Sequence, residues 1–217
     1  MTRRKVLTSA VAVAVCTVVV AAGILIRAPR VQAHEEDEGD RGRIERGFDI
    51  APVPLNLEGK NRELVGLGSY LVNAVADCNG CHSAGPPTEY LNTGNPYTGA
   101  KVTQINPATY LGGGRDFGPF AGVPHLYSRN LTPDKTGMAE GGHTFKEFLT
   151  IIRTGVDMDH VHPNLAPPFD GNLLQVMPWP VHRNMSTHDL RAIYEYLSAI
   201  PCIEGPPAPS PLHNDCK

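Results

Sequence analysis

The chain has 217 residues and a formal net charge of −3. Lysine and arginine cluster only within the first five residues, so the basic surface that nucleic-acid binding requires is missing and we expect no nucleic-acid partner. The length predicts one ordinary globular domain plus extensions. The 22 glycines and 20 prolines predict short helices and long connections within it.

Residues 1–33 have the features of a membrane anchor or a signal peptide. Basic residues at 3–5 precede an uncharged apolar run over 6–26, which is long enough to cross a bilayer as a helix. The basic end should stay in the cytoplasm, which exports the rest of the chain. We favour a retained N-terminal apolar helix because the run is longer than in an ordinary signal peptide. Cleavage after Ala33, giving a soluble periplasmic protein, is the alternative.

The segment 34–59 is highly charged at its start and contains prolines further on. Such a composition buries too little apolar surface to offset its ordering entropy, so we expect a solvated linker. The folded domain is then expected over 60–203, and a proline-rich C-terminal tail over 204–217.

The first predicted helix covers residues 61–76, where leucines and valines recur at helical spacing. Gly68 lies in the middle of its apolar face and costs about 1 kcal/mol relative to alanine, which indicates that another backbone comes close there. Two further helices are predicted at residues 144–155 and 185–201, and no convincing alternating strand pattern is present. The predicted fold class is therefore all-α.

Two later helices carry recognisable start and stop signals. Residues 144–155 begin with a capping box of Thr144 and Glu147 and end at a glycine. Residues 185–201 have Ser186 as the N-cap, with Asp189 three residues further on, and end at a proline.

The sequence DCNGCH contains Cys78, Cys81 and His82 directly after the first helix. A Cys-x-x-Cys pair serves in zinc sites, dithiol redox centres or haem attachment. A second pair at zinc spacing is missing, and a redox dithiol is expected beside a βαβ unit. The adjacent histidine favours haem attachment, in which two thioether bonds hold the porphyrin and the imidazole binds the iron.

The stretches GSYLVNAVADCNGCH, YSRNLTPDKTG, TFKEFLTIIRTG and MPWPVHRNMSTHDLRAIYEYL resemble the haem domains of bacterial membrane-associated dehydrogenase cytochrome c subunits. The resemblance covers residues 60–203 and implies a class I cytochrome c fold around one covalently bound haem c. It also implies that the first and last helices cross at a glycine and an aromatic residue, here Gly68 against Tyr194 or the neighbourhood of Tyr70. A layer of loops over the haem is expected from residues 85–143.

Met177 stands at the family position of the second axial ligand, and methionine is the usual partner of histidine in such carriers. Prolines on either side of Trp179 favour a stiff loop that can hold the sulfur there. Met185 has another explanation, because it precedes Ser186 and can pack against Leu190 at the start of the last helix. Met138 and Met158 rank lower on the resemblance.

Three further residues are candidates for supporting the haem. Arg115 and Arg129 could each pair with a propionate, and no spacing argument chooses between them. The carbonyl of Pro86 could accept a hydrogen bond from the second ring nitrogen of His82.

We interpret the protein as a periplasmic electron carrier, not an enzyme, because no nucleophile, base and orienting group combine into a substrate site. Its partners would be a redox donor such as a dehydrogenase and an acceptor such as an oxidase. The alternative is a haem enzyme or sensor with an open sixth position. Cys202 and Cys216 should form a disulfide in an oxidising compartment.

Overall fold

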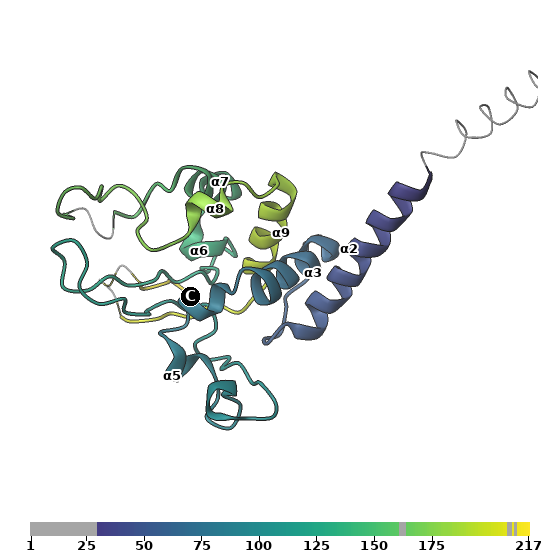
Figure 1. The fold of residues 1–217 in the computed structure, drawn as a ribbon, viewed down its shortest axis with the longest axis horizontal. Coiled ribbons are helices and arrows are strands. Elements are labelled where there is room, and N and C mark those ends of the chain that lie inside the picture. Colours follow the sequence, from purple (N-terminus) through teal and green to yellow (C-terminus); the bar gives the residue numbers. More distant parts are fainter. Residues whose placement is uncertain (1–29, 161–163, 208–209, 211) are drawn as a thin grey trace, which may run out of the picture. The chain divides into compact units, whose positions relative to one another are not determined.

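The computed structural model describes residues 30–160, 164–207, 210 and 212–217 (Figure 1). The predicted apolar helix at 6–26 lies outside this range. Among the described residues, no helix is long and apolar enough to span a bilayer. The chain divides into two compact units, Met1–Gly42 and Arg43–Lys217, and the packed core and the site described below belong to the second.

The described part of the chain consists of helices and loops, with isolated β-bridges as its β-structure. This helix-rich architecture agrees with the predicted all-α class and is compatible with a cytochrome c fold. In chain order the elements are α2 (Arg30–Ile50), α3 (Arg62–Tyr70), the π-helix η1 (Leu71–Val75), α4 (Cys78–Cys81), α5 (Pro86–Glu89), the 3-10 helix η2 (Pro96–Thr98), α6 (Ala139–Gly142), α7 (Phe145–Thr154), α8 (Trp179–His182) and α9 (Thr187–Leu197).

The three predicted helices form where local signals place them, as α3 with η1, α7 and α9. The capping box of Thr144 and Glu147 is present in both directions, and Gly155 ends α7 with φ +74°. Ser186 caps α9 by accepting a hydrogen bond from the backbone N–H of Asp189 at 3.0 Å. These interactions join residues only three or four positions apart, which is why the sequence predicts them well.

Helices α3 and α9 form the centre of the core and cross at Gly68. A Cβ at this position would lie 2.0 Å from the carbonyl oxygen of Ala192 and 2.7 Å from the Cβ of Tyr196. The close backbone predicted from the glycine is therefore present. Its aromatic neighbour is Tyr196 instead of Tyr194, because Tyr196 lies one helical turn after Ala192 on the same face of α9.

The segment expected as a solvated linker at 34–59 is helical up to Ile50. Ile44 and Phe48 are half-buried and pack against the core. Gly47 contacts α3 closely, and its carbonyl accepts a hydrogen bond from the Ser69 hydroxyl at 2.6 Å. The packed unit thus begins before Lys60. The charged composition of residues 34–59 did not predict this packing, because a few apolar residues on one helical face are enough to dock a helix.

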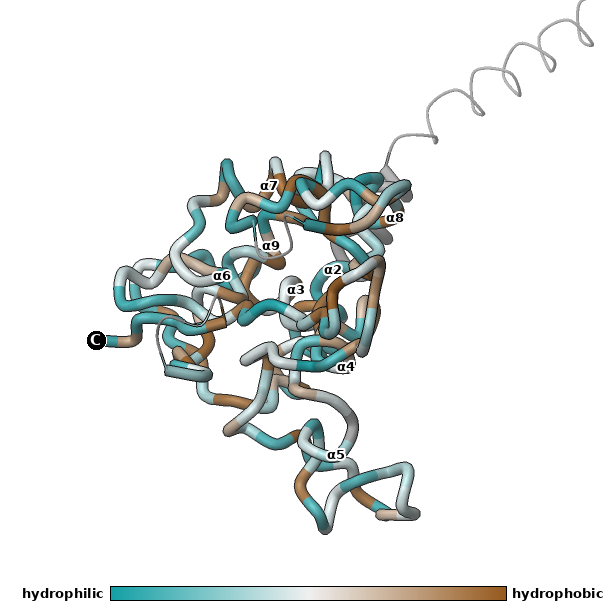
Figure 2. The backbone as a smooth tube through the Cα atoms, turned by 90° about the vertical axis from the view of Figure 1, so that its left-hand side faces the viewer, coloured by the Kyte–Doolittle hydropathy of each residue, from teal (hydrophilic) through white to brown (hydrophobic). Residues whose placement is uncertain are grey.

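Residues 86–108, here called the α5 lobe, extend away from the helical core (Figure 2). The lobe is held by its own backbone, with Leu91 N–H donating to the Gln104 carbonyl at 2.9 Å and Gln104 N–H donating to the Gly94 carbonyl at 2.9 Å. Tyr97 in η2 is 80% exposed. The expectation that all of 85–143 forms a layer over the site is therefore wrong for this lobe.

The C-terminal tail is fixed to the domain at several points. The predicted disulfide between Cys202 and Cys216 is confirmed. Asn214 is 2% exposed, and its amide donates to the carbonyls of Thr132 at 3.1 Å and Pro133 at 2.8 Å. The tail thus covers the loop that leads into α6.

Candidate functional site

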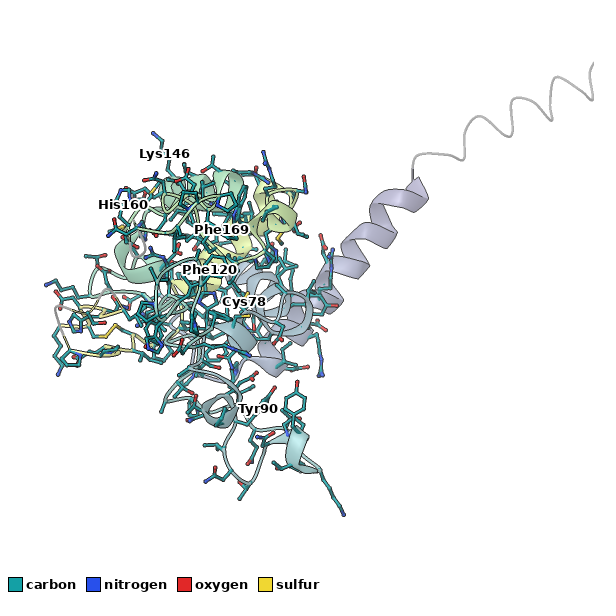
Figure 3. The ribbon with its side chains drawn as sticks, turned by 60° about the vertical axis from the view of Figure 1, so that its left-hand side comes forward. Cys78, Tyr90, Phe120, Lys146, His160 and Phe169 are labelled. Atoms are coloured by element: carbon teal, nitrogen blue, oxygen red, sulfur yellow. A yellow bond between two sulfur atoms is a disulfide. The ribbon has the colours of Figure 1, made fainter. Side chains whose placement is uncertain are left out.

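A cavity of about 1160 Å³, including the part open to solvent, lies within the second unit. Cys78, Cys81, His82 and Met177, the four residues predicted as cofactor ligands, all line it. Cys78 lies in the middle of the unit, between the helices and the loops (Figure 3). The rest of the wall is mainly apolar and includes Phe117, Leu126, Leu131, Phe148, Ile151, Ile152, Leu173, Leu174, Leu190, Ile193 and Leu197.

The two cysteines of the motif sit on the short helix α4. Both are free thiols, Cys78 half-buried and Cys81 exposed. Burial, followed by the nearby Asp77 carboxylate and Cys81, raises the pKa of Cys78 to about 12. The turn between them is tight, since a Cβ on Gly80 would lie 2.6 Å from an Asp77 carboxylate oxygen. Arg115 donates a hydrogen bond to the Gly80 carbonyl and so holds this turn from outside.

His82 is 9% exposed, and its ring orientation is fixed by a hydrogen bond. Its Nδ1 lies 2.7 Å from the backbone carbonyl oxygen of Arg129. Because a carbonyl can only accept, Nδ1 carries the hydrogen, which leaves the Nε2 lone pair free for a metal. The pKa of His82 is lowered, mainly by burial. A lowered pKa favours the neutral imidazole, which is the form that binds a metal.

Arg129 therefore supplies the partner that the sequence analysis assigned to Pro86. The partner lies 47 positions from His82 in the chain, so no local pattern indicated it. The Arg129 guanidinium pairs with the carboxylates of Asp157 and Asp159. Arg129 also lines the cavity, whereas Arg115 is not among the lining residues.

The loop that carries Met177 is sharply bent. Val176 has φ +64°, an unusual conformation for a β-branched residue. The Met177 N–H donates to the Gln175 carbonyl at 2.6 Å, and the Trp179 N–H donates to the Met177 carbonyl at 2.8 Å. Trp179 is seated against Gly155, where a Cβ would lie 2.2 Å from its Cε2. This packing ties the loop to the end of α7.

Met177 is accompanied by two other potential iron ligands in the cavity wall, Met185 and His182. His182, at the end of α8, was not singled out from the sequence, because one histidine in a polar stretch carries no signal. Burial lowers its pKa. Met138 and Met158 are not among the lining residues.

Glu140 is another lining residue that the sequence analysis missed. It is 8% exposed, and its Oε2 atom has no hydrogen-bond partner in the structure. Its backbone is in the left-handed region with φ +53°. The pKa of the Glu140 carboxyl is raised, and burial is the largest cause.

This set of donors fits a covalently attached haem. Two unpaired thiols occupy one side of an apolar cavity, and the imidazole of His82 has a defined tautomer. The thioether of Met177 reaches the same cavity from a separate loop. Among the described residues, no group of three or more histidine, cysteine or acidic side chains is arranged to hold a metal ion.

Comparison with known proteins points in the same direction. The chain is 29% identical over 136 residues to the gluconate 2-dehydrogenase cytochrome c subunit of Pantoea cypripedii. The matched region is 63% of this chain and 23% of that protein, so the chain spans less than a quarter of its relative's length. No family model matches the chain. No solved structure matches it either.

Proposed function

We propose that this protein is an electron-carrying c-type cytochrome with one haem c attached through Cys78 and Cys81. The observation that carries the proposal is the meeting of both free thiols with a correctly oriented His82 in one apolar cavity. A bound haem would supply one-electron chemistry at its iron. The likeness to a dehydrogenase cytochrome c subunit supports the same assignment.

In this proposal the side chains have separate tasks. His82 binds the iron through Nε2, and the Arg129 carbonyl fixes the ring and increases its basicity. Met177 provides the second ligand, a soft sulfur that favours the reduced state. The apolar wall excludes water, while the exposed Cys81 keeps one side of the site close to solvent, where a partner can exchange electrons.

We further propose that the donor is a dehydrogenase and the acceptor an oxidase or another cytochrome. The relative's name supports a dehydrogenase as donor. The sequence has a single Cys-x-x-Cys-His motif, so this chain would contribute one redox centre to such a pathway. The protein itself would not transform a small-molecule substrate.

The proposed location is the periplasmic face of the cytoplasmic membrane, anchored by residues 6–26. The disulfide between Cys202 and Cys216 supports an oxidising compartment. If the anchor is retained, the protein stays with membranes through a salt wash and is released only by detergent. A mature N-terminus at His34 in mass spectrometry would exclude the anchor.

The function is tested by expressing the full chain together with the haem-attachment machinery. The expected product carries haem that resists acid extraction, and its spectrum is low-spin with the weak band of iron bound to methionine sulfur. Cys78→Ser with Cys81→Ser should abolish covalent attachment, whereas Cys202→Ser leaves it intact. A high-spin spectrum would favour the haem enzyme or sensor. Absence of haem from the wild-type protein would exclude both functions.

A further inference from the structure

Glu140 lines the cavity, and no hydrogen bond to its Oε2 atom explains why its carboxyl group is buried there. Its residue is 8% exposed and its Oε2 atom has no hydrogen-bond partner, although the cavity passes beside it. Burying an ionised carboxylate without a partner is costly, so such a group tends to hold a proton. A buried polar atom without a partner in a functional cavity calls for a physical explanation.

The charges around Glu140 give it little compensation. The guanidinium of Arg129, a permanent cation that acts on the Glu140 carboxyl, already pairs with Asp157 and Asp159. The Nδ1–H of His143 donates to the Glu140 backbone carbonyl at 2.8 Å. From α9, which packs against α6, the Tyr194 hydroxyl donates to the His143 carbonyl at 2.9 Å.

These neighbours act in opposite directions on the Glu140 carboxyl. After burial, His143 and Arg129 lower its pKa, while the carboxylates of Asp159 and Asp157 raise it, and the net shift is upward. Asp134 approaches the same turn at Gly142, where a Cβ would lie 2.7 Å from its carboxylate. Because these influences partly cancel, one more positive charge in the cavity would favour the ionised form of the Glu140 carboxyl.

Resting on the proposed function, we propose that Glu140 takes a proton from solvent when the haem iron accepts one electron from an external one-electron donor. On oxidation the carboxyl group returns that proton to solvent. The ferric centre carries one more positive charge than the ferrous centre, and it stabilises the carboxylate across the low-dielectric cavity. One proton therefore accompanies one electron within a limited pH range, and charge is balanced.

The sign of the effect follows from this linkage. Protonated Glu140 favours the reduced protein, so the reduction potential falls as pH rises between the carboxyl pKa of the oxidised protein and that of the reduced protein. The slope reaches at most about 59 mV per pH unit, the value for a tenfold change in a one-electron equilibrium. Outside that range Glu140 contributes no slope.

The test is a spectroelectrochemical titration of the haem-loaded full chain from about pH 5 to 9, a span that covers raised carboxyl pKa values. The wild type should show the falling potential. Glu140→Gln should remove that slope and, at the alkaline end, leave the potential above that of the wild type. Glu140→Asp keeps a carboxyl group and should retain a slope at a shifted pH.

His143→Gln is the matched control, because this histidine contacts the Glu140 backbone carbonyl and its charge acts on the Glu140 carboxyl. It should retain a slope. The proposal is wrong if the wild-type potential does not change with pH, if Glu140→Gln keeps the wild-type slope, or if only His143→Gln removes it. These results leave the cytochrome assignment intact, whereas a chain that attaches no haem refutes the proposed function itself.

Discussion

Replacing Gly68 with alanine tests the close contact between α3 and α9 on which the core depends. The added methyl group would lie 2.0 Å from the Ala192 carbonyl oxygen and 2.6 Å from the Ala192 carbonyl carbon. Ordinary contact starts near 3.4 Å, so the two helices must separate by more than 1 Å. The obstacle is backbone, which cannot rotate away as a flexible side chain can.

The expected cost follows from two opposing effects. Overpacking a core usually costs about 1 to 3 kcal/mol, and a clash with backbone belongs at the upper end. Alanine is about 1 kcal/mol better than glycine inside a helix, which offsets part of that cost. We therefore expect Gly68→Ala to lower the free energy of unfolding by about 2 kcal/mol, or the Tm by about 4 to 8 °C for a chain of this size.

The assay is thermal and urea unfolding of the haem-loaded protein, followed by circular dichroism. Gly42→Ala is the control, because a Cβ at Gly42 in α2 meets no atom within 4 Å. It should leave the stability unchanged or slightly higher. If Gly68→Ala is as stable as the wild type, the helices do not cross as closely as described and the packing argument fails.

Other predictions concern the Met177 loop and the C-terminal tail. Met177→Ala should keep covalent haem, shift the iron toward high spin and lower its potential, whereas Met185→Ala should keep the low-spin spectrum; the opposite pattern would make Met185 the ligand. Val176→Gly should preserve thermal stability, because it removes the strain of φ +64°, yet let added imidazole displace the methionine more easily; unchanged imidazole affinity would contradict a positioning role. Cys202→Ser opens a disulfide whose cysteines are 14 positions apart and should cost about 3 kcal/mol in urea unfolding, and a loss below 1 kcal/mol would show that the Asn214 contacts suffice to hold the tail.

The sequence by itself determined the features that depend on short-range chemistry. Thr144 with Glu147, and Ser186 with Asp189, are three positions apart, so their capping interactions can be read directly from the chain. The motif at Cys78 to His82 likewise specifies its chemistry within five residues. The pair Cys202 and Cys216 could be predicted because no other cysteines of the exported part were left to combine.

The tertiary structure decided how distant residues complete the site. Nothing near His82 in the chain indicates that the Arg129 carbonyl fixes its ring, or that Glu140 and His182 reach the same cavity as Met177. Such contacts depend on how loops return to the core after α3, α7 and α9 have packed, and they leave no periodic pattern. Gly68 illustrates the division well, because helix propensity predicted a close neighbour while only the crossing with α9 selected Ala192 and Tyr196.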